Sequence, residues 1–243
     1  MKNILVVTHE RAGTHLVINI INKENNGDFI PIGKLPLAET RFDLENYTKF
    51  VKRHILYQPY NPDVVFKAHH QVEFFESYID KLFENFKVIY VKRDIKDVLI
   101  SYYKFLNIDG FDKNGKSIII PNFPEFKDWI FMKPCEVGYK YFERYPDPHV
   151  FIEPSTYIER YTMHLNGWMR YKDKFLLMNY EDVLSDFNSI KEKLEIYLNK
   201  KVENSLPDLH DKSLPNFVPN KGIVGAYKEV MDDDLIRKIT SII

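Results

Sequence analysis

Short apolar runs that end in charged or glycine-containing turns recur along the 243-residue chain, and most lead into apolar residues at helical spacing. Four of these runs predict buried strands of a parallel sheet, at Ile4–Val7, Val64–Phe66, Val88–Val91 and Phe175–Met178. The helical spacing predicts helices over Leu16–Ile21, Leu44–Leu56, Glu73–Phe83, Ile95–Tyr102, Pro134–Tyr145 and Ser189–Leu198. This alternation indicates an α/β fold in which a central parallel β-sheet is flanked by helices.

The stretch from Lys87 to Phe105 shows the pattern most clearly. Its strand ends at Arg93 and Asp94, and Asp94 is expected to be the N-cap of the helix that follows. Asp97 places a second carboxylate in the first turn of that helix. Because open α/β sheets bind ligands at the C-terminal ends of their strands, this turn is a candidate binding site.

Composition narrows the class of protein. Hydrophobic residues at 44% and charged residues at 28% predict a globular protein, and the length fits one domain over residues 1–243. A formal net charge of −1 provides no basic field that would favour nucleic acid. Cys135 is the only cysteine, which excludes an internal disulfide and a multi-cysteine zinc site. With no signal peptide at Lys2-Asn3 and no apolar run near ~18–20 residues, a cytoplasmic location without a membrane span is expected.

The first predicted strand leads into a turn typical of phosphate binding, His9-Glu10-Arg11-Ala12-Gly13-Thr14-His15. A strand, a glycine-containing turn and a helix direct backbone N–H groups and a helix N-terminus at an anion. The nucleotide-kinase form of this loop, G-x-x-x-x-G-K-[ST], is absent because no lysine follows Gly13. Arg11 supplies a cation that stays charged and donates only hydrogen bonds. A solvated loop cation is the alternative interpretation of Arg11.

The second predicted strand is followed by Lys67-Ala68-His69-His70. A histidine with an ordinary pKa near ~6.5 is suited to removing a proton from a hydroxyl at neutral pH. Lys67 and His69 are two residues apart, so in an extended chain their side chains point the same way, and His70 points to the opposite side. A one-residue shift would exchange His69 and His70, and a pair of surface histidines is the other interpretation.

Five segments together resemble the cytosolic PAPS-dependent sulfotransferases, and they occur in that family's order between residues 8 and 228. They are the loop around Gly13, the K-x-H of Lys67 and His69, the R-x7-S of Arg93 and Ser101, the Y-E-D that begins at Tyr180, and Lys221-Gly222 near the C-terminus. The resemblance implies a single α/β domain with a P-loop-like phosphate-binding loop after the first strand.

The resemblance also implies a reaction and its residues. PAPS would be the sulfuryl donor and PAP the product, with no metal required. His69 would be the general base that accepts the proton of a hydroxyl or amine acceptor, while Lys67 and Arg11 stabilise charge on the transferring group. The donor site would comprise Arg11, Ala12, Gly13, Thr14, His15, Arg93, Ser101, Tyr180, Lys221 and Gly222.

Several positions depart from the family pattern. Arg11 stands in place of Lys, Ala12 of Ser and His15 of the second Thr, while Asn220 replaces Arg and Tyr227 replaces Trp. Two other classes therefore stay open. A P-loop-type nucleotide kinase would act on ATP with Mg²⁺, and a non-catalytic protein would bind PAP or another nucleotide without turnover.

The aromatic-rich segment 106–133 is expected to be an irregular lid or part of the acceptor pocket, and a second small core cluster is compatible with it. His164 and Trp168 share a helix face, for which a structural role is expected. The sequence does not identify the acceptor, a small molecule or a glycan, or decide between monomer and homodimer. Phe42 and Tyr47 are candidates for the aromatic residue that stacks on the adenine.

Overall fold

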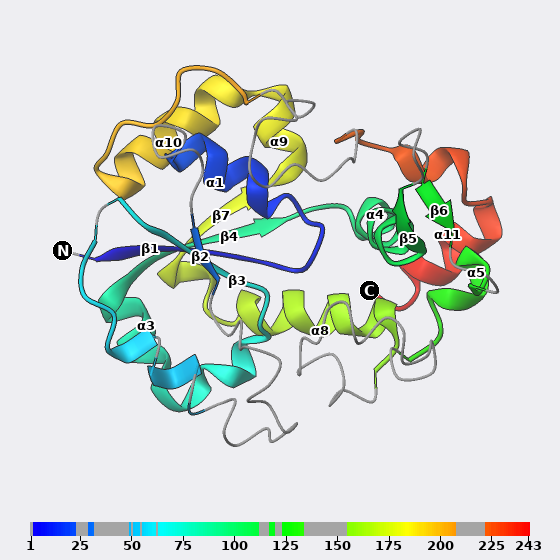
Figure 1. Cartoon of the computed structure of the whole chain (residues 1–243), viewed down its shortest axis with the longest axis horizontal. Helices are drawn as coiled ribbons and strands as arrows, with labels where there is room; N and C mark the ends of the chain where they lie inside the picture. The colour runs from blue at the N-terminus through cyan, green and yellow to red at the C-terminus, as the bar shows by residue number, and fades with distance from the viewer. Residues whose placement is uncertain are drawn as a thin grey trace. The chain divides into compact units, whose positions relative to one another are not determined.

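The structure is a computed structural model, and it describes residues 2–22, 29–31, 49, 51–53, 55–61, 63–111, 117–119, 123–133, 155–207 and 222–243. The chain forms two compact units (Figure 1). The first, here the sheet unit, comprises Met1–Arg93 and His164–Ile223. The second unit comprises Asp94–Met163 and Val224–Ile243.

Five parallel strands form the centre of the sheet unit, in the order β2-β3-β1-β4-β7 (Figure 1). Their bounds are β1 Asn3–Thr8, β2 Phe29–Pro31, β3 Val65–Ala68, β4 Phe86–Lys92 and β7 Leu176–Asn179. All six residues of the central strand β1 are buried, as expected for a parallel strand covered on both faces. The four predicted strands are confirmed, each within two residues of its expected bounds.

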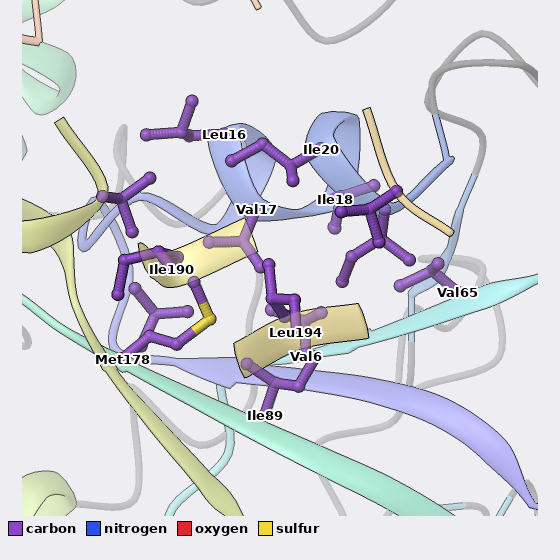
Figure 2. Close-up of a cluster of buried hydrophobic side chains, with 14 of the residues drawn as sticks. Val6, Leu16, Val17, Ile18, Ile20, Val65, Ile89, Met178, Ile190 and Leu194 are labelled. Carbon is purple, nitrogen blue, oxygen red and sulfur yellow. The ribbon is translucent and has the colours of Figure 1, made fainter. Parts of the chain in front are cut away.

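One face of the sheet packs against α1 (Thr14–Asn22), α9 (Tyr180–Ser185) and α10 (Phe187–Leu198). Aliphatic side chains from the strands and helices interdigitate there, and they include Val6, Val17, Ile89, Met178 and Leu194 (Figure 2). Burying a side chain of this size stabilises the fold by about 1.5–3 kcal/mol. This layer packs α1 against β1, and residues 9–13 form the turn between the two elements.

The opposite face carries a second cluster, which is richer in aromatic residues. Because successive side chains of a strand alternate between faces, Leu5 and Val7 of β1 point into this layer. They pack with Phe66 of β3, with Leu82 of α3 (Ile79–Asn85) and with Trp168. The two clusters together confirm the predicted sheet flanked by helices.

The predicted helix over Glu73–Phe83 is only partly correct. Two 3₁₀ turns, η2 (Val72–Phe74) and η3 (Glu76–Tyr78), precede α3. The buried residues Val72, Phe75 and Tyr78, of which Phe75 lies between the two turns, recur at every third position. Three residues per turn is the period of a 3₁₀ helix, so the same apolar spacing is satisfied by the tighter geometry. A third 3₁₀ turn, η5 (Lys172–Lys174), leads into β7.

The second unit begins with α4 (Ile95–Leu106), whose predicted N-cap is confirmed because Asp94 Oδ1 accepts a hydrogen bond from the Lys96 N–H at 2.9 Å. An antiparallel pair, β5 (Ile108–Phe111) and β6 (Ser117–Ile119), follows. Among the described residues, the remaining elements are α5 (Phe126–Trp129), α8 (Tyr157–Met169), η6 (Ala226–Glu229) and α11 (Asp233–Thr240). Helix α8 passes into the sheet unit at His164.

Segment 106–133 is therefore more regular than the irregular lid that the sequence predicts. Besides the strand pair, it contains Trp129, which is fully buried and stacks on Tyr157 with ring centroids 4.1 Å apart. The ring edges of Tyr102 and Tyr103 from α4 also meet Trp129. These contacts form a small aromatic core, which was one of the two expectations for this segment, and the lid role stays a prediction.

Some predicted elements fall on residues outside those described. They are the helix over Pro134–Tyr145 and much of the one over Leu44–Leu56, of which residues 49, 51–53 and 55–56 are helical. The adenine-stacking candidates Phe42 and Tyr47 also lie outside the described residues. Among the helices described, none is long and apolar enough to cross a membrane. A single domain over residues 1–243 stays a prediction.

Candidate active site

The turn between β1 and α1 has the backbone of an anion-binding loop. Arg11 has φ 67° and Gly13 has φ 103°, both in the left-handed region that is rare for residues with a side chain. The Ala12 N–H donates to the His9 carbonyl at 3.2 Å, and α1 begins at Thr14. A tight turn of this kind before a helix N-terminus is typical of sites that cradle phosphate.

Tyr180, the first residue of α9, packs over this turn. A Cβ built on Gly13 would lie 2.3 Å from Tyr180 Cδ2, so only glycine fits beneath the ring. The guanidinium of Arg93 lies over the same ring, with Cζ 4.3 Å from the centroid. The ring of Tyr180 thus contacts both the anion-binding loop and Arg93, the residue that follows β4.

Arg93 is buried at this point, with only 7% of its surface exposed. Its Nη2 donates to the Ile223 carbonyl at 3.0 Å, and its Nη1 donates to the Arg11 carbonyl at 3.4 Å. A buried guanidinium with these partners is fixed in position at the C-terminal edge of the sheet. Arg93, Arg11 and the C-terminal segment are therefore brought together in the sheet unit.

The C-terminal segment is held by side chains in each unit. In the sheet unit, the Tyr180 hydroxyl donates to the carbonyl of Gly222, which has φ 59°. In the second unit, the carboxylate of Asp97 accepts hydrogen bonds from the Gly225 N–H at 2.7 Å and the Tyr227 N–H at 3.2 Å. Asp97 thereby anchors this segment to α4, a role that the sequence analysis missed.

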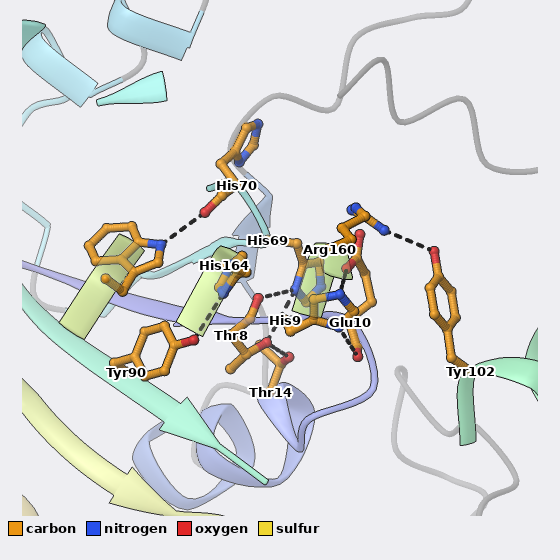
Figure 3. Close-up of polar contacts among 11 residues, drawn as sticks. Thr8, His9, Glu10, Thr14, His69, His70, Tyr90, Tyr102, Arg160 and His164 are labelled. Carbon is orange, nitrogen blue, oxygen red and sulfur yellow. Dashed lines mark hydrogen bonds and ion pairs between the residues drawn. The ribbon is translucent and has the colours of Figure 1, made fainter. Parts of the chain in front are cut away.

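His69 follows the last residue of β3 and faces the end of β1. Its Nδ1 lies 2.9 Å from the Thr8 carbonyl and 3.2 Å from Thr8 Oγ1, which in turn lies 2.5 Å from Thr14 Oγ1 (Figure 3). Since a carbonyl oxygen can only accept, Nδ1 carries the proton and donates it. Nε2 is then the basic nitrogen of the imidazole, which is the form that a general base requires.

His70 has a different environment. Only 2% of its surface is exposed, and the edges of the Phe74 and Phe75 rings lie against its ring. Its carbonyl accepts a hydrogen bond from Trp168 Nε1 at 3.0 Å (Figure 3). His164, one turn before Trp168, shares a 2.9 Å hydrogen bond between Nδ1 and the hydroxyl of Tyr90. His164 and Trp168 are both buried, in keeping with the structural role expected of them.

Lys67 is the third residue of β3, rather than the first residue after it as the sequence analysis assumed. Strand pairing continues through this charged residue, which lies opposite Val6 of β1 and Pro31 of β2. Its Nζ lies 3.2 Å from His15 Nε2 and 4.9 Å from the centroid of the Phe29 ring. Edge strand β2, which was not predicted, supplies that ring.

The electrostatics of the loop favour a neutral His15. Burial, together with the nearby Lys67, His69 and Arg11, lowers the pKa of His15 from its ordinary value of 6.5 to about 3. The imidazole is therefore uncharged at neutral pH, and the cationic side chains around it contribute to this. Its Nδ1 is buried and has no hydrogen-bond partner among the described residues.

Most of the residues predicted from the sequence lie around this loop in the sheet unit, namely Arg11, Ala12, Gly13, Thr14, His15, Lys67, His69, Arg93, Tyr180 and Gly222. Ser101 is buried in α4 of the second unit, and its place beside Arg93 stays a prediction. Lys221 lies outside the described residues. Within the described part of the chain, no group of three or more His, Cys, Asp or Glu residues could hold a metal ion.

Sequence comparisons find sulfotransferases. Sulfotransferase 2A1 of Macaca fascicularis is 27% identical over 206 residues, which cover 83% of this chain and 61% of that protein. Luciferin sulfotransferase of Photinus pyralis is 26% identical over 170 residues, which cover 69% of this chain and 34% of that protein. The chain therefore spans less than two thirds of the length of these curated relatives.

Solved structures give the same result for the fold. Mouse sulfotransferase SULT7A1 complexed with PAP matches with a TM-score of 0.61 at 16% identity, over 99% of this chain and 82% of that chain. Retinol dehydratase in complex with androsterone and the inactive cofactor PAP matches with a TM-score of 0.59 at 15% identity, over 100% of this chain and 80% of that chain. These likenesses confirm the predicted α/β fold with a P-loop-like loop.

The family itself is shown by a profile match along the chain. The profile described as "Sulfotransferase domain" matches residues 1–243. The family that the five sequence segments resemble is thus confirmed, and the chain belongs to the sulfotransferase domain family.

Proposed function

We propose that this protein is an enzyme that transfers the sulfuryl group of PAPS to a hydroxyl or amine of a small acceptor, with His69 as the general base. The observation that carries the proposal is the hydrogen bond from His69 Nδ1 to the Thr8 carbonyl at 2.9 Å. It leaves Nε2 as the basic nitrogen at the edge of a phosphate-type loop. Family membership supports sulfuryl transfer as the reaction.

The residues around the loop fit an anionic donor. Left-handed backbone at Arg11 and Gly13 precedes the N-terminus of α1, where N–H groups attract negative charge. Nδ1 of His15, which is buried without a hydrogen-bond partner among the described residues, is a further candidate contact for the donor. Two PAP complexes among the structural neighbours support PAPS as the donor. We assign its 5′-phosphosulfate to this loop, which comprises Arg11, Ala12, Gly13, Thr14 and His15.

We assign the 3′-phosphate to Arg93, Ser101, Lys221 and Gly222, and the adenine to the neighbourhood of Tyr180. In support, Arg93 is a buried cation at the end of β4, and the C-terminal segment approaches it through the Ile223 carbonyl. Binding a distant phosphate holds the reacting atoms in place and contributes to catalysis through orientation.

In the proposed reaction, His69 Nε2 accepts the proton of the acceptor as its oxygen or nitrogen attacks sulfur. The bond between sulfur and the bridging oxygen breaks, and the electron pair goes to the 5′-phosphate of the departing PAP. Arg11 and Lys67 stabilise the charge that develops on the sulfuryl and bridging oxygens. Phosphate is a stable anion at neutral pH, so charge stabilisation by Arg11 suffices at the position where the family has lysine.

The test is a donor-specificity experiment followed by a transfer assay. PAP and ATP are compared by thermal shift, and ³⁵S-labelled PAPS is then offered with luciferin, androsterone, retinol and a panel of phenols, alcohols and amines. We expect PAP to raise the melting temperature more than ATP, and label to appear in at least one acceptor. Equal shifts would contradict the donor assignment. Tight PAP binding without transfer to any acceptor would instead indicate a non-catalytic binding protein.

A further inference from the structure

The ammonium of Lys67 contacts two uncharged rings that come from different elements. His15 Nε2 of α1 lies 3.2 Å from Lys67 Nζ, and the Phe29 ring of β2 lies 4.9 Å from it. The two rings also meet edge to face, with centroids 5.3 Å apart. The contact with Phe29 is a cation–π interaction, in which the ring quadrupole attracts the ammonium.

The chemistry of the pair determines the tautomer of His15. A lysine ammonium has three donors and no acceptor, so Lys67 donates and His15 Nε2 accepts. A neutral imidazole that accepts through Nε2 carries its proton on Nδ1. Nε2 is therefore committed to Lys67, whereas the Nδ1–H faces away from it and has no described partner.

A neutral imidazole and a carboxylate would affect the charge of Lys67 differently. An aspartate or glutamate in contact with Lys67 would fix the ammonium but would also cancel much of its charge towards an anionic ligand. A neutral imidazole fixes the ammonium and leaves its charge intact. The charged or titratable groups that act on His15 are Lys67, His69 and Arg11, and all three disfavour its protonation.

We propose that His15 is a positioning residue for the reaction, which acts through Lys67 by accepting its hydrogen bond as a neutral imidazole. The inference rests on the proposed sulfuryl transfer, in which Lys67 stabilises the developing charge. It assigns Nε2 of His15 a role separate from any contact between its Nδ1–H and the donor. Phe29 completes the arrangement as an apolar neighbour of both the ammonium and the His15 ring.

Two substitutions at position 15 separate these roles. The amide oxygen of glutamine reaches the position of Nε2, so His15→Gln keeps an uncharged acceptor for Lys67. The amide of asparagine reaches only the position of Nδ1, so His15→Asn keeps a donor there and loses the acceptor. Melting temperatures of both variants serve as the folding control, and PAP affinity reports on the donor contact.

Turnover with an acceptor from the labelled-PAPS screen is measured for both variants, alone and with Lys67→Met. We expect His15→Gln to stay within about 3-fold of wild type, and His15→Asn to lose about 10-fold or more in kcat with little change in PAP affinity. In the Lys67→Met background His15→Asn should have no further effect, because the partner is already absent. Equal losses in the two variants, or full additivity with Lys67→Met, would overturn the inference.

A spectroscopic measurement tests the pair without any transfer. Long-range ¹H–¹⁵N correlation spectra of wild type at pH 7 should show His15 as the Nδ1–H tautomer, with an Nε2 shift that changes in Lys67→Met. If wild type shows the Nε2–H tautomer, the positioning role is wrong whether or not the protein transfers sulfuryl groups. If the tautomer is as expected but PAPS is never turned over, the proposed function fails and the positioning role fails with it, although the hydrogen bond stands.

Discussion

The ring of Tyr180 occupies the space above Gly13 in which any other residue would place its Cβ, 2.3 Å from Tyr180 Cδ2. Gly13 also has φ 103°, which residues with a side chain rarely adopt. The turn between β1 and α1 therefore packs closely against the start of α9. The Arg93 guanidinium also lies over the Tyr180 ring, so a change at Gly13 that moves this ring is expected to disturb Arg93 as well as the loop.

Gly13→Ala should destabilise the protein by on the order of 2–5 kcal/mol, because backbone strain and steric overlap with Tyr180 add together. In a Tyr180→Ala background the same substitution should cost only the strain, about 1–2 kcal/mol. Urea denaturation of the four proteins measures the difference. Equal costs in both backgrounds would show that the ring moves aside freely.

Arg93→Ala should weaken PAP binding by roughly 10-fold or more, the effect of losing a charge-assisted hydrogen bond. ATP affinity should change little, because ATP has no 3′-phosphate. Calorimetric titration with each nucleotide provides the comparison. Arg170→Ala is the matched control, since Arg170 is an exposed arginine paired with Glu73 and Glu76. An unchanged PAP affinity in Arg93→Ala would remove Arg93 from the donor site.

Substitutions of Arg11 can separate the effect of its charge on turnover from the effect of backbone strain on stability, because Arg11 has φ 67°. Arg11→Lys keeps both and should retain substantial activity. Arg11→Ala and Arg11→Gly should each lose on the order of 10²-fold in turnover, whereas the glycine variant should be about 1 kcal/mol more stable than the alanine variant. Kinetics and thermal unfolding are measured on the same preparations. An active Arg11→Ala enzyme would mean that this loop does not contact the transferring group.

The stability of the folded protein should depend on pH through the titration of His15. Its pKa is lowered in the folded protein to about 3 from an ordinary value of 6.5, since burial and nearby cations oppose its protonation. The unfolded chain therefore binds a proton between these pH values that the folded protein does not. The stability contributed by His15 is complete above about pH 6.5 and is lost as the pH falls towards 3.

Wild type should accordingly lose its advantage over His15→Phe as the pH is lowered from 7 to 4, by at most about 1.4 kcal/mol per pH unit. Urea unfolding at several pH values measures the free energy of unfolding of both proteins. Phenylalanine retains the ring volume beside Phe29 and removes the titration. Parallel pH profiles of the two proteins would show that His15 titrates normally.

The sequence predicted the parts of the site that depend on local order along the chain. The strand end before Arg93, the N-cap at Asp94 and the glycine at position 13 all follow from periodicity and turn chemistry. Their grouping at one edge follows from parallel strand topology, which places the C-terminal ends of neighbouring strands together.

What the sequence did not predict depends on tertiary contacts. Strand β2 has only three residues and ends in Pro31, so no periodic signal marks it, yet it supplies the Phe29 ring to Lys67. The end of β3 was misplaced because a lysine resembles a strand terminus, although ladder pairing with β1 continues through Lys67. Asp97 was expected only to complement its own helix, whereas its carboxylate accepts two backbone N–H groups from a segment about 130 residues later.

The proposed role of His69 as the general base is tested most directly by comparing His69→Asn with His70→Asn. Asparagine at position 69 can keep a donor to the Thr8 carbonyl in place of Nδ1 but has no counterpart of the basic Nε2. His70 is packed between Phe74 and Phe75, so its substitution should lower the melting temperature rather than turnover.

The measurement is kcat for sulfuryl transfer from PAPS to a demonstrated acceptor, with PAP affinity determined in parallel. We expect His69→Asn to lose about 10²–10⁴-fold in kcat with PAP affinity near wild type, and His70→Asn to stay within a few-fold of wild type in kcat. Loss of turnover in His70→Asn alone, or full turnover in both variants, would contradict the assignment of His69.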